Sequence, residues 1–258
     1  MGLLDGKTAL IVGVANKRSI AWAIAKALSD EGARCAFTYQ NERVGAEVQK
    51  LADTLPQPGP VLPLDVQDDA QLDAAVSGAA EGLGGLDILV HAVAFARADD
   101  LGGRFVDTDR EGFELAADIS AYSLSALARR AEPHMAARGG GSVMALSYVA
   151  AERAVPGYNV MGVAKSTLES IVRYLAWDLG ESGIRVNAIS AGPVRTLAAR
   201  SIPGFLDMAD KAAERSPLRR SITQEEVAGS AVFLASDLST GVTGHTLYVD
   251  AGFHAMGL

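Results

Sequence analysis

Short apolar runs alternate with longer segments of helical period along the chain. The first helical segment places Ile20, Ile24 and Leu28 on one face and reaches a stop signal at Gly32. Runs of four to nine residues that are apolar throughout are typical of strands covered on both faces. The pattern predicts seven such strands, in TALIVG, RCAFTY, VLPLDV, LDILVHAVA, SVMALS, IRVNAIS and HTLYVD.

Helical segments separate these strands. After the first helix we expect one marked by Val44, Val48, Leu51 and Leu55, then others over roughly 68–83, 110–137, 157–181 and 223–236. Strict alternation of strands and helices predicts a parallel sheet with helices on both faces. The predicted fold class is therefore α/β, a doubly wound Rossmann-type parallel sheet in three α/β/α layers.

The alternation continues without a linker, so we expect one domain over residues 1–258. The stretch PQPGP (56–60) predicts a surface loop, because the pattern resumes directly after it. The least regular stretch is 193–221, which holds several prolines and apolar residues without a clear period. Long irregular segments in compact domains are usually functional, so we expect a substrate-binding lid at about 193–215.

Composition and charge narrow the function classes. Of 258 residues 49% are hydrophobic, and the net charge is −8 without a long basic run, which disfavours nucleic acid and anionic membranes as partners. A single cysteine, Cys35, excludes an intrachain disulfide, and the four histidines are scattered, so no metal site is expected. No apolar run reaches about 18 residues, and an acidic residue stands where a signal peptide needs a basic region. We therefore expect a soluble, cytoplasmic protein.

A candidate phosphate-binding turn lies between the first strand and the first helix. In doubly wound sheets this position brings helix N–H groups to an anion. In the sequence GVANKRSIA, Gly13 can supply a tight turn, and Ser19 can cap the helix and bind a phosphate. The motif is not G-x-G-x-x-G, however, and an ordinary strand–helix turn with a serine cap explains it equally well.

Two further strand ends fit an adenine nucleotide. Gln40 ends the second predicted strand, where a side chain meets the adenine ribose. Its neutral amide favours NADH. Arg43 nearby could still bind the 2′-phosphate of NADPH, so that cofactor stays an alternative. Asp65 ends the third predicted strand, where its carboxylate can accept from the adenine amino group. The alternative for Asp65 is a helix cap or a turn residue.

Several motifs in order along the chain carry a family resemblance. They are GVANKRSIA, the pair Asp65-Val66, HAVAFA, DISAYS (118–123), LSY (146–148), YNVMGVAK (158–165) and RVNAISAGPVRTLA (185–198). The set resembles the short-chain dehydrogenase/reductase superfamily and, within it, the bacterial enoyl-acyl-carrier-protein reductase branch, over essentially the whole chain. One departure is Ala94, where that branch often has glycine.

The resemblance implies NADH-dependent reduction of trans-2-enoyl thioesters carried by acyl carrier protein, in fatty acid elongation, by a homotetramer. It implies catalysis by Tyr158, Tyr148 and Lys165, and an acyl site that includes Ala96 beside both tyrosines. It also implies NAD-binding residues, namely Gly13, Ser19, Ile20, Gln40, Asp65, Val66, Val93, Lys165, Val194, Arg195, Thr196, Leu197 and Ala198.

The spacing of Tyr158 and Lys165 distinguishes two reactions. Ketone-reducing members of the superfamily carry tyrosine four positions before lysine, and Met161 stands there in this chain. The hydroxyl is thereby displaced by about one helical turn, roughly 5 Å. A displaced phenol suits an enoyl thioester, which accepts hydride at its β-carbon while negative charge develops on the more distant thioester oxygen.

The expected roles follow from that chemistry. Tyr158 would stabilise the enolate, and Tyr148 would line the acyl site. Lys165 would hold the nicotinamide ribose and, as a nearby cation, favour phenolate character in Tyr158. Trp22 and Trp177 are expected to pack between helices.

Two rival functions remain. A ketone or alcohol oxidoreductase of the same superfamily is disfavoured by Met161 and Tyr148. A non-catalytic nucleotide-binding member is disfavoured because both Tyr158 and Lys165 are present, although two such residues seven apart also occur by chance on helices.

Overall fold

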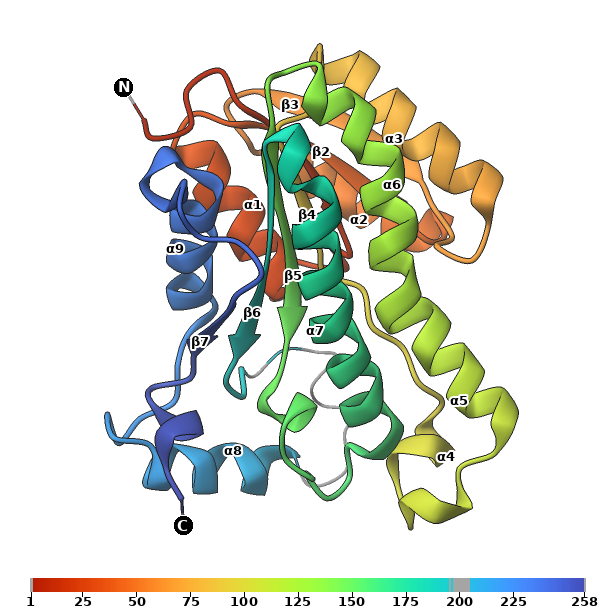
Figure 1. Cartoon of the computed structure of the whole chain (residues 1–258), viewed down its shortest axis with the longest axis vertical. Coiled ribbons are helices and arrows are strands. Elements are labelled where there is room, and N and C mark those ends of the chain that lie inside the picture. The colour runs from red at the N-terminus through yellow and green to blue at the C-terminus, as the bar shows by residue number, and fades with distance from the viewer. Residues whose placement is uncertain (1, 195, 197–204, 258) are drawn as a thin grey trace.

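Parallel strands form one sheet through the centre of the molecule (Figure 1). The structure is a computed structural model, and it describes residues 2–194, 196 and 205–257. Within these residues the strand order is β3-β2-β1-β4-β5-β6-β7, and every neighbouring pair is parallel. The strands are β1 (Thr8–Val12), β2 (Arg34–Tyr39), β3 (Pro58–Pro63), β4 (Ile88–His91), β5 (Gly141–Ser147), β6 (Ile184–Ala191) and β7 (Thr246–Val249).

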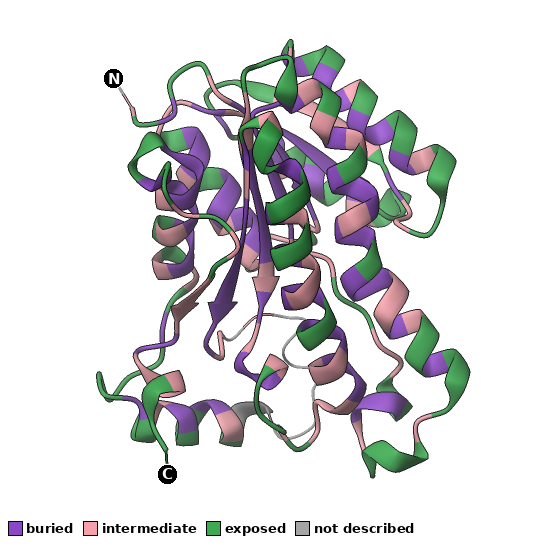
Figure 2. Ribbon diagram, in the orientation of Figure 1, coloured by how far each residue is buried: buried purple, intermediate pink, exposed green. Residues whose placement is uncertain are grey.

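Helices cover both faces of the sheet. The helices are α1 (Ile20–Asp30), α2 (Glu42–Ala52), α3 (Asp69–Leu83), α4 (Ala98–Leu101), α5 (Arg110–Ala117), α6 (Ser123–Ala136), α7 (Asn159–Leu179), α8 (Phe205–Arg215) and α9 (Gln224–Ala235). One buried apolar cluster joins the sheet to α1, α2 and α9, and a second joins it to α3, α6 and α7. Burial is concentrated between these layers (Figure 2). The predicted three-layer, doubly wound fold is confirmed.

The third strand differs from the prediction. We expected residues 61–66 as a strand and 56–60 as a loop, but β3 spans Pro58–Pro63 and so takes up part of that loop. Proline lacks the N–H group that a central strand must donate, so it is tolerated only where one side of the strand is unpaired. The strand lies at the edge of the sheet and pairs only with β2, through a register shift between Cys35 and Phe37.

The helix expected over 110–137 is interrupted. A π-helical turn (Asp118–Tyr122) separates α5 from α6. Such turns insert one extra residue and rotate the side chains that follow, and they are common at functional sites.

One predicted packing residue is solvent-exposed instead. Trp22 is buried beside Phe37, with ring centroids 6.1 Å apart. Trp177 is 83% exposed on α7 and does not pack between helices. Ala176 and Leu179, close by in the sequence, are buried against the core. Trp177 therefore lies outside the apolar face of α7.

The carboxyl ends of the strands converge on one edge of the sheet, at the bottom of Figure 1. The connection after β1 leads through α1 to β2 on one side, whereas β4 lies on the other side of β1. This is the switch point at which doubly wound sheets bind ligands. No helix of the described residues is both long and apolar enough to cross a membrane.

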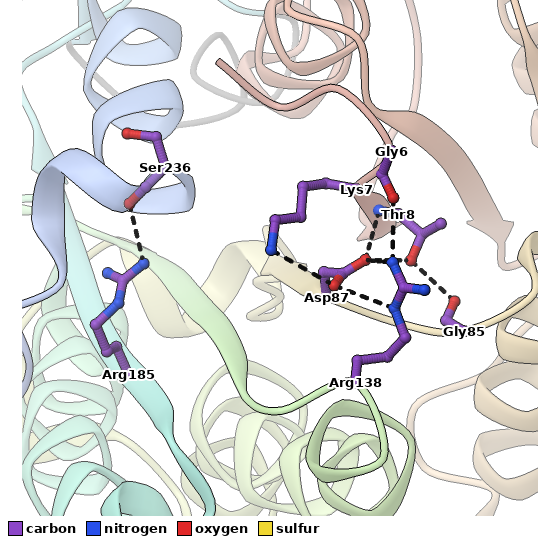
Figure 3. Close-up of polar contacts among 8 residues, drawn as sticks. All are labelled: Gly6, Lys7, Thr8, Gly85, Asp87, Arg138, Arg185 and Ser236. Carbon is purple, nitrogen blue, oxygen red and sulfur yellow. Dashed lines mark hydrogen bonds and ion pairs between the residues drawn. The ribbon is translucent and has the colours of Figure 1, made fainter. Parts of the chain in front are cut away.

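A buried carboxylate fastens the opposite end of the sheet (Figure 3). Asp87, just before β4, accepts hydrogen bonds from the backbone N–H and the hydroxyl of Thr8, both at 2.9 Å. The guanidinium of Arg138 lies 3.0 Å from the same oxygen, and Lys7 lies 3.8 Å from the other. The cluster joins β1, β4 and the turn after α6, so it holds the central strands in register.

Replacing Asp87 by alanine should destabilise the fold by about 3 kcal/mol. The change leaves the Thr8 N–H without its acceptor and removes the counter-ion of Arg138. Asp107→Ala is the matched control, because its pair with Arg104 is exposed on both sides. Urea unfolding of the two variants should separate them, and equal midpoints would show that the cluster does not hold the sheet.

Candidate active site

A cavity of about 610 Å³ opens at the carboxyl ends of β4, β5 and β6. Eight residues of the predicted site line it: Ile20, Val93, Ala96, Tyr148, Tyr158, Lys165, Val194 and Thr196. They come from segments far apart in the sequence, which the parallel sheet brings to one edge. Arg195, Leu197 and Ala198, also predicted here, lie outside the described residues.

The turn before α1 has a geometry that requires glycine. Gly13 has a φ of 109°, and a Cβ built on it would lie 2.3 Å from the carbonyl oxygen of Ala92. The turn therefore presses against the end of β4. Ser19 caps α1: its hydroxyl accepts from the N–H of Trp22 at 3.2 Å and donates to the carbonyl of Asn16 at 2.7 Å.

The residues predicted to bind adenosine lie outside this cavity, along the same edge. Gln40 follows β2 and is exposed. Asp65 follows β3, and its carboxylate accepts from the N–H of Gln67 at 3.0 Å, so it has the turn role that was its alternative. Val66 packs partly against the apolar layer beneath. Gly13, Gln40 and Asp65 thus follow β1, β2 and β3 at the carboxyl edge of the sheet, where an extended dinucleotide would run.

Tyr148 and Tyr158 face one another in the cavity. Their rings meet edge to face, with centroids 5.1 Å apart. Tyr148 directly follows β5, and its hydroxyl lies 3.5 Å from the sulfur of Met208 on α8. Tyr158 is the cap residue before α7 rather than part of the helix. The next residue, Asn159, has a φ of 31° and donates to the carbonyl of Gly102 at 2.9 Å, which ties this turn to the end of α4.

Both tyrosines are neutral phenols. Burial raises the pKa of Tyr148 to about 12. Burial also raises the pKa of Tyr158, and the charge that Tyr148 would carry raises it further. The expectation that Lys165 gives Tyr158 phenolate character is therefore wrong. Burial disfavours the charged form of each phenol, so each keeps its proton and can act as a hydrogen-bond donor.

Lys165 is buried on the first turns of α7, and its amine lines the cavity. Its Nζ donates to the carbonyl oxygen of Leu146, at the end of β5, at 2.7 Å. Burial lowers the pKa of Lys165 to about 8, and the carboxylate of Glu169 opposes that change. The pKa of Lys165 thus lies close to physiological pH, so a small change in its surroundings can change its charge.

The structure adds a positioning group that sequence reasoning did not identify. The π-helical turn places Ser120 beside the chain that follows β4. Its hydroxyl accepts from the N–H of Phe95 at 2.9 Å and donates to the carbonyl of the same residue at 3.1 Å. Ser120 thereby holds the backbone that carries Ala96. The DISAYS motif marked this serine, but only the inserted residue of the turn explains its direction.

His91, at the end of β4, is a buried histidine close to the cavity. Its Nε2 lies 2.7 Å from the hydroxyl of Ser123, while its Nδ1 has no hydrogen-bond partner in the described part of the chain. Burial, followed by the charge of Lys165, lowers the pKa of His91 to about 3. The imidazole is neutral and does not supply a cation to the cavity. No cluster of metal-ligating side chains occurs within residues 2–194, 196 and 205–257.

Comparison with known families decides the classification. A sequence model described as enoyl-(acyl carrier protein) reductase matches residues 13–254. The chain belongs to the enoyl-(acyl carrier protein) reductase family. It is 52% identical to the NADH-dependent reductase FabI of Bacillus cereus over 258 residues, with 100% of each chain covered. It is 49% identical to the NADPH-dependent FabI of Staphylococcus aureus (strain MRSA252), with 98% of each chain covered.

A solved reductase shares the whole architecture. The crystal structure of the Bacillus cereus enoyl-acyl carrier protein reductase with NADP⁺ and indole naphthyridinone superposes with a TM-score of 0.97 at 52% identity, and 100% of both chains is covered. The two relatives named above thus include one NADH-dependent and one NADPH-dependent reductase.

The turn at Gly13 supplies a test of this site. Gly13→Ala should lower the melting temperature and weaken nucleotide binding, because the new methyl group collides with the carbonyl of Ala92 and displaces the turn. Gly6→Ala is the matched control: Gly6 also has a positive φ, 75°, but its Cβ would meet nothing within 4 Å. Calorimetric titration with NADH and thermal unfolding measure both effects. Equal losses in the two variants would remove the special role of this turn.

Proposed function

We propose that this reductase transfers hydride from NADH to the β-carbon of a trans-2-enoyl thioester held on acyl carrier protein, with Tyr158 donating to the thioester oxygen. The observation that carries the proposal is the pair of neutral phenols facing one cavity beside a buried lysine. The position four before that lysine is Met161, which lines the same cavity and has no proton to donate. A ketone at that position would have no acid beside its oxygen.

The residues present fit a nicotinamide dinucleotide. The α1 N-terminus offers N–H groups to the pyrophosphate, and Gly13 lets the backbone turn sharply before it. Ile20, Val93, Val194 and Thr196 line the cavity between that turn and the tyrosines. When bound, NADH supplies the hydride, and the protein positions and polarises the thioester.

Tyr158 serves the charge that develops during reduction. Hydride addition at the β-carbon moves negative charge to the thioester oxygen, and a donor fixed there lowers the barrier. Because burial raises its pKa, Tyr158 keeps its proton until an oxyanion forms. A proton taken up from solvent at the α-carbon then completes the saturated thioester. Tyr148, edge-on to the same ring, lines the acyl site and assists.

Lys165 holds the cofactor. Its amine is anchored by the carbonyl of Leu146 and faces the cavity, so its remaining donors suit the hydroxyls of the nicotinamide ribose. The expected lid, 193–215, includes residues 195 and 197–204, which lie outside the described residues; its described parts border the cavity. In support, Val194 and Thr196 line the cavity, and Met208 of α8 contacts Tyr148.

We further propose that the protein acts in the cytoplasm as a homotetramer. Tyr174 and Trp177, on α7, are 72% and 83% exposed, which leaves large aromatic surface uncovered on one helix. The last strand, β7, is an edge strand whose residues are only half-buried. Both features favour contacts between copies along the last strand and its flanking helices.

Removing the Tyr158 hydroxyl tests the proposed role. Tyr158→Phe should lower the rate of crotonyl-thioester reduction by about 10²–10³, the loss typical of one oxyanion donor. The dissociation constant for NADH should stay unchanged, because the hydroxyl acts on substrate. Tyr122→Phe, at an exposed tyrosine, is the control. Absorbance loss of NADH measures the rate, and undiminished turnover in Tyr158→Phe would refute the assignment.

Cofactor preference gives a second test. The wild type should use NADH more efficiently than NADPH, because neutral Gln40 offers no charge to a 2′-phosphate and Glu42 begins α2 beside it. Gln40→Arg should raise the kcat/KM for NADPH. Gln49→Arg, further along α2, adds the same charge away from the ribose and should not. Equal or better efficiency of the wild type with NADPH would contradict this preference.

A further inference from the structure

Three residues of alternating charge follow one face of α7. Lys165, Glu169 and Arg173 are spaced four apart, so each lies one turn beyond the last. Arg173 is exposed, but Lys165 and Glu169 are only 5% and 7% exposed. Burying a carboxyl group is costly unless it is paired and hydrogen-bonded. Glu169 is therefore not an ordinary surface charge, and the reaction as described above gives it no role.

Two consecutive residues of β5 bind these two turns of the helix. The carbonyl of Leu146 accepts from the Nζ of Lys165 at 2.7 Å. The hydroxyl of Ser147 donates to the Oε1 of Glu169. The side chain of Thr246, on β7, also acts to lower the pKa of Glu169. The lysine and the glutamate are thus fixed to the same strand end that carries Tyr148.

We propose that Glu169 is a positioning residue for Lys165: its carboxylate keeps the ammonium charged, and its bond to Ser147 holds that turn of α7 against β5. The inference rests on the proposed role of Lys165 as the group that holds the nicotinamide ribose. A charged amine makes stronger hydrogen bonds than a neutral one, so the charge on Lys165 supports cofactor affinity.

The other titratable groups around the amine do not replace Glu169. His91, on β4, is neutral, because burial lowers its pKa to about 3. Tyr148 and Tyr158 are neutral phenols, because burial raises the pKa of both. Burial of Lys165 lowers its pKa to about 8, and Glu169 acts against that fall.

Several neighbouring groups affect the pKa of Glu169. Burial is the main cause that raises its pKa, and the nearby charge of Glu152 adds to it. The bond from Ser147 and the charge of Arg173 favour the ionised carboxylate. Glu152 is itself bound by the hydroxyl of Tyr248, on β7, whose pKa burial raises. The Glu169 side chain therefore lies one turn of α7 from each of two basic residues and accepts a hydrogen bond from Ser147 of β5.

The test compares cofactor affinity across pH. Glu169→Gln removes the charge but keeps the size and an acceptor for Ser147. In the wild type the dissociation constant for NADH, followed by fluorescence, should begin to rise near pH 8, where Lys165 loses its proton. In Glu169→Gln the rise should begin about one pH unit lower, because an opposite charge within one turn has been lost. Below both transitions the two proteins should bind NADH alike.

Two further variants separate this role from a structural one. Asp178→Asn removes a charge from the exposed face of the same helix, 13 residues or about 20 Å along the axis from Lys165, and should leave the pH profile unchanged. Glu169→Asp keeps the charge and should keep the wild-type onset, even if it melts earlier. It also provides the measurement if Glu169→Gln does not fold.

The inference is overturned if the NADH profile of Glu169→Gln superimposes on that of the wild type, or if Glu169→Asp shifts as much as Glu169→Gln. Failure of the proposed function would look different. In that case the wild type would bind NADH with the expected pH profile and leave a crotonyl thioester unreduced.

Discussion

Burial of a phenol and an amine at the carboxyl edge of the sheet is the constraint on which the rest of the site depends. Desolvation favours the neutral form of each group. For Tyr158 this is useful, because a phenol that keeps its proton is a donor for an oxyanion. For Lys165 it is a liability, because its pKa falls to about 8. The charge of Glu169 acts against that fall, and the carbonyl of Leu146 accepts a hydrogen bond from the amine.

The position of the phenol then decides between reactions. The proposed proton donor is Tyr158, which precedes α7, while Met161 occupies the position nearer the lysine. A donor one turn away matches an acceptor whose charge develops on an oxygen three bonds from the carbon that receives hydride. The fold supplies the framework, and this displacement supplies the specificity for an enoyl thioester.

Much of the framework could be predicted from the sequence, because buried parallel strands and amphipathic helices leave distinct periodicities. The prediction was wrong at β3, where prolines suggested a loop but an unpaired strand edge tolerates them. It was wrong at Trp177, because a single aromatic residue does not reveal which helix face it occupies. The π-helical turn at Ser120 was not predicted, since one inserted residue hardly disturbs a helical pattern.

The charge states of the site residues were harder to predict from the sequence than the identity of those residues. Tyr158 and Lys165 were identified by motif, and the structure places both on one cavity. Their interaction was misjudged, because a pKa depends on burial, and burial depends on the whole fold. Glu169 was overlooked because a glutamate on a helix is usually solvated, and only the packing of α7 against β5 buries it.

The most direct measurement compares two thioesters with the wild-type protein and NADH. A crotonyl thioester presents a carbon–carbon double bond, and an acetoacetyl thioester of the same length presents a ketone. With Tyr158 displaced and Met161 beside the lysine, we expect rapid oxidation of NADH with the crotonyl compound and none above background with the acetoacetyl compound. Efficient reduction of the acetoacetyl thioester, with a slow or absent reaction of the crotonyl thioester, would contradict enoyl reduction at this site.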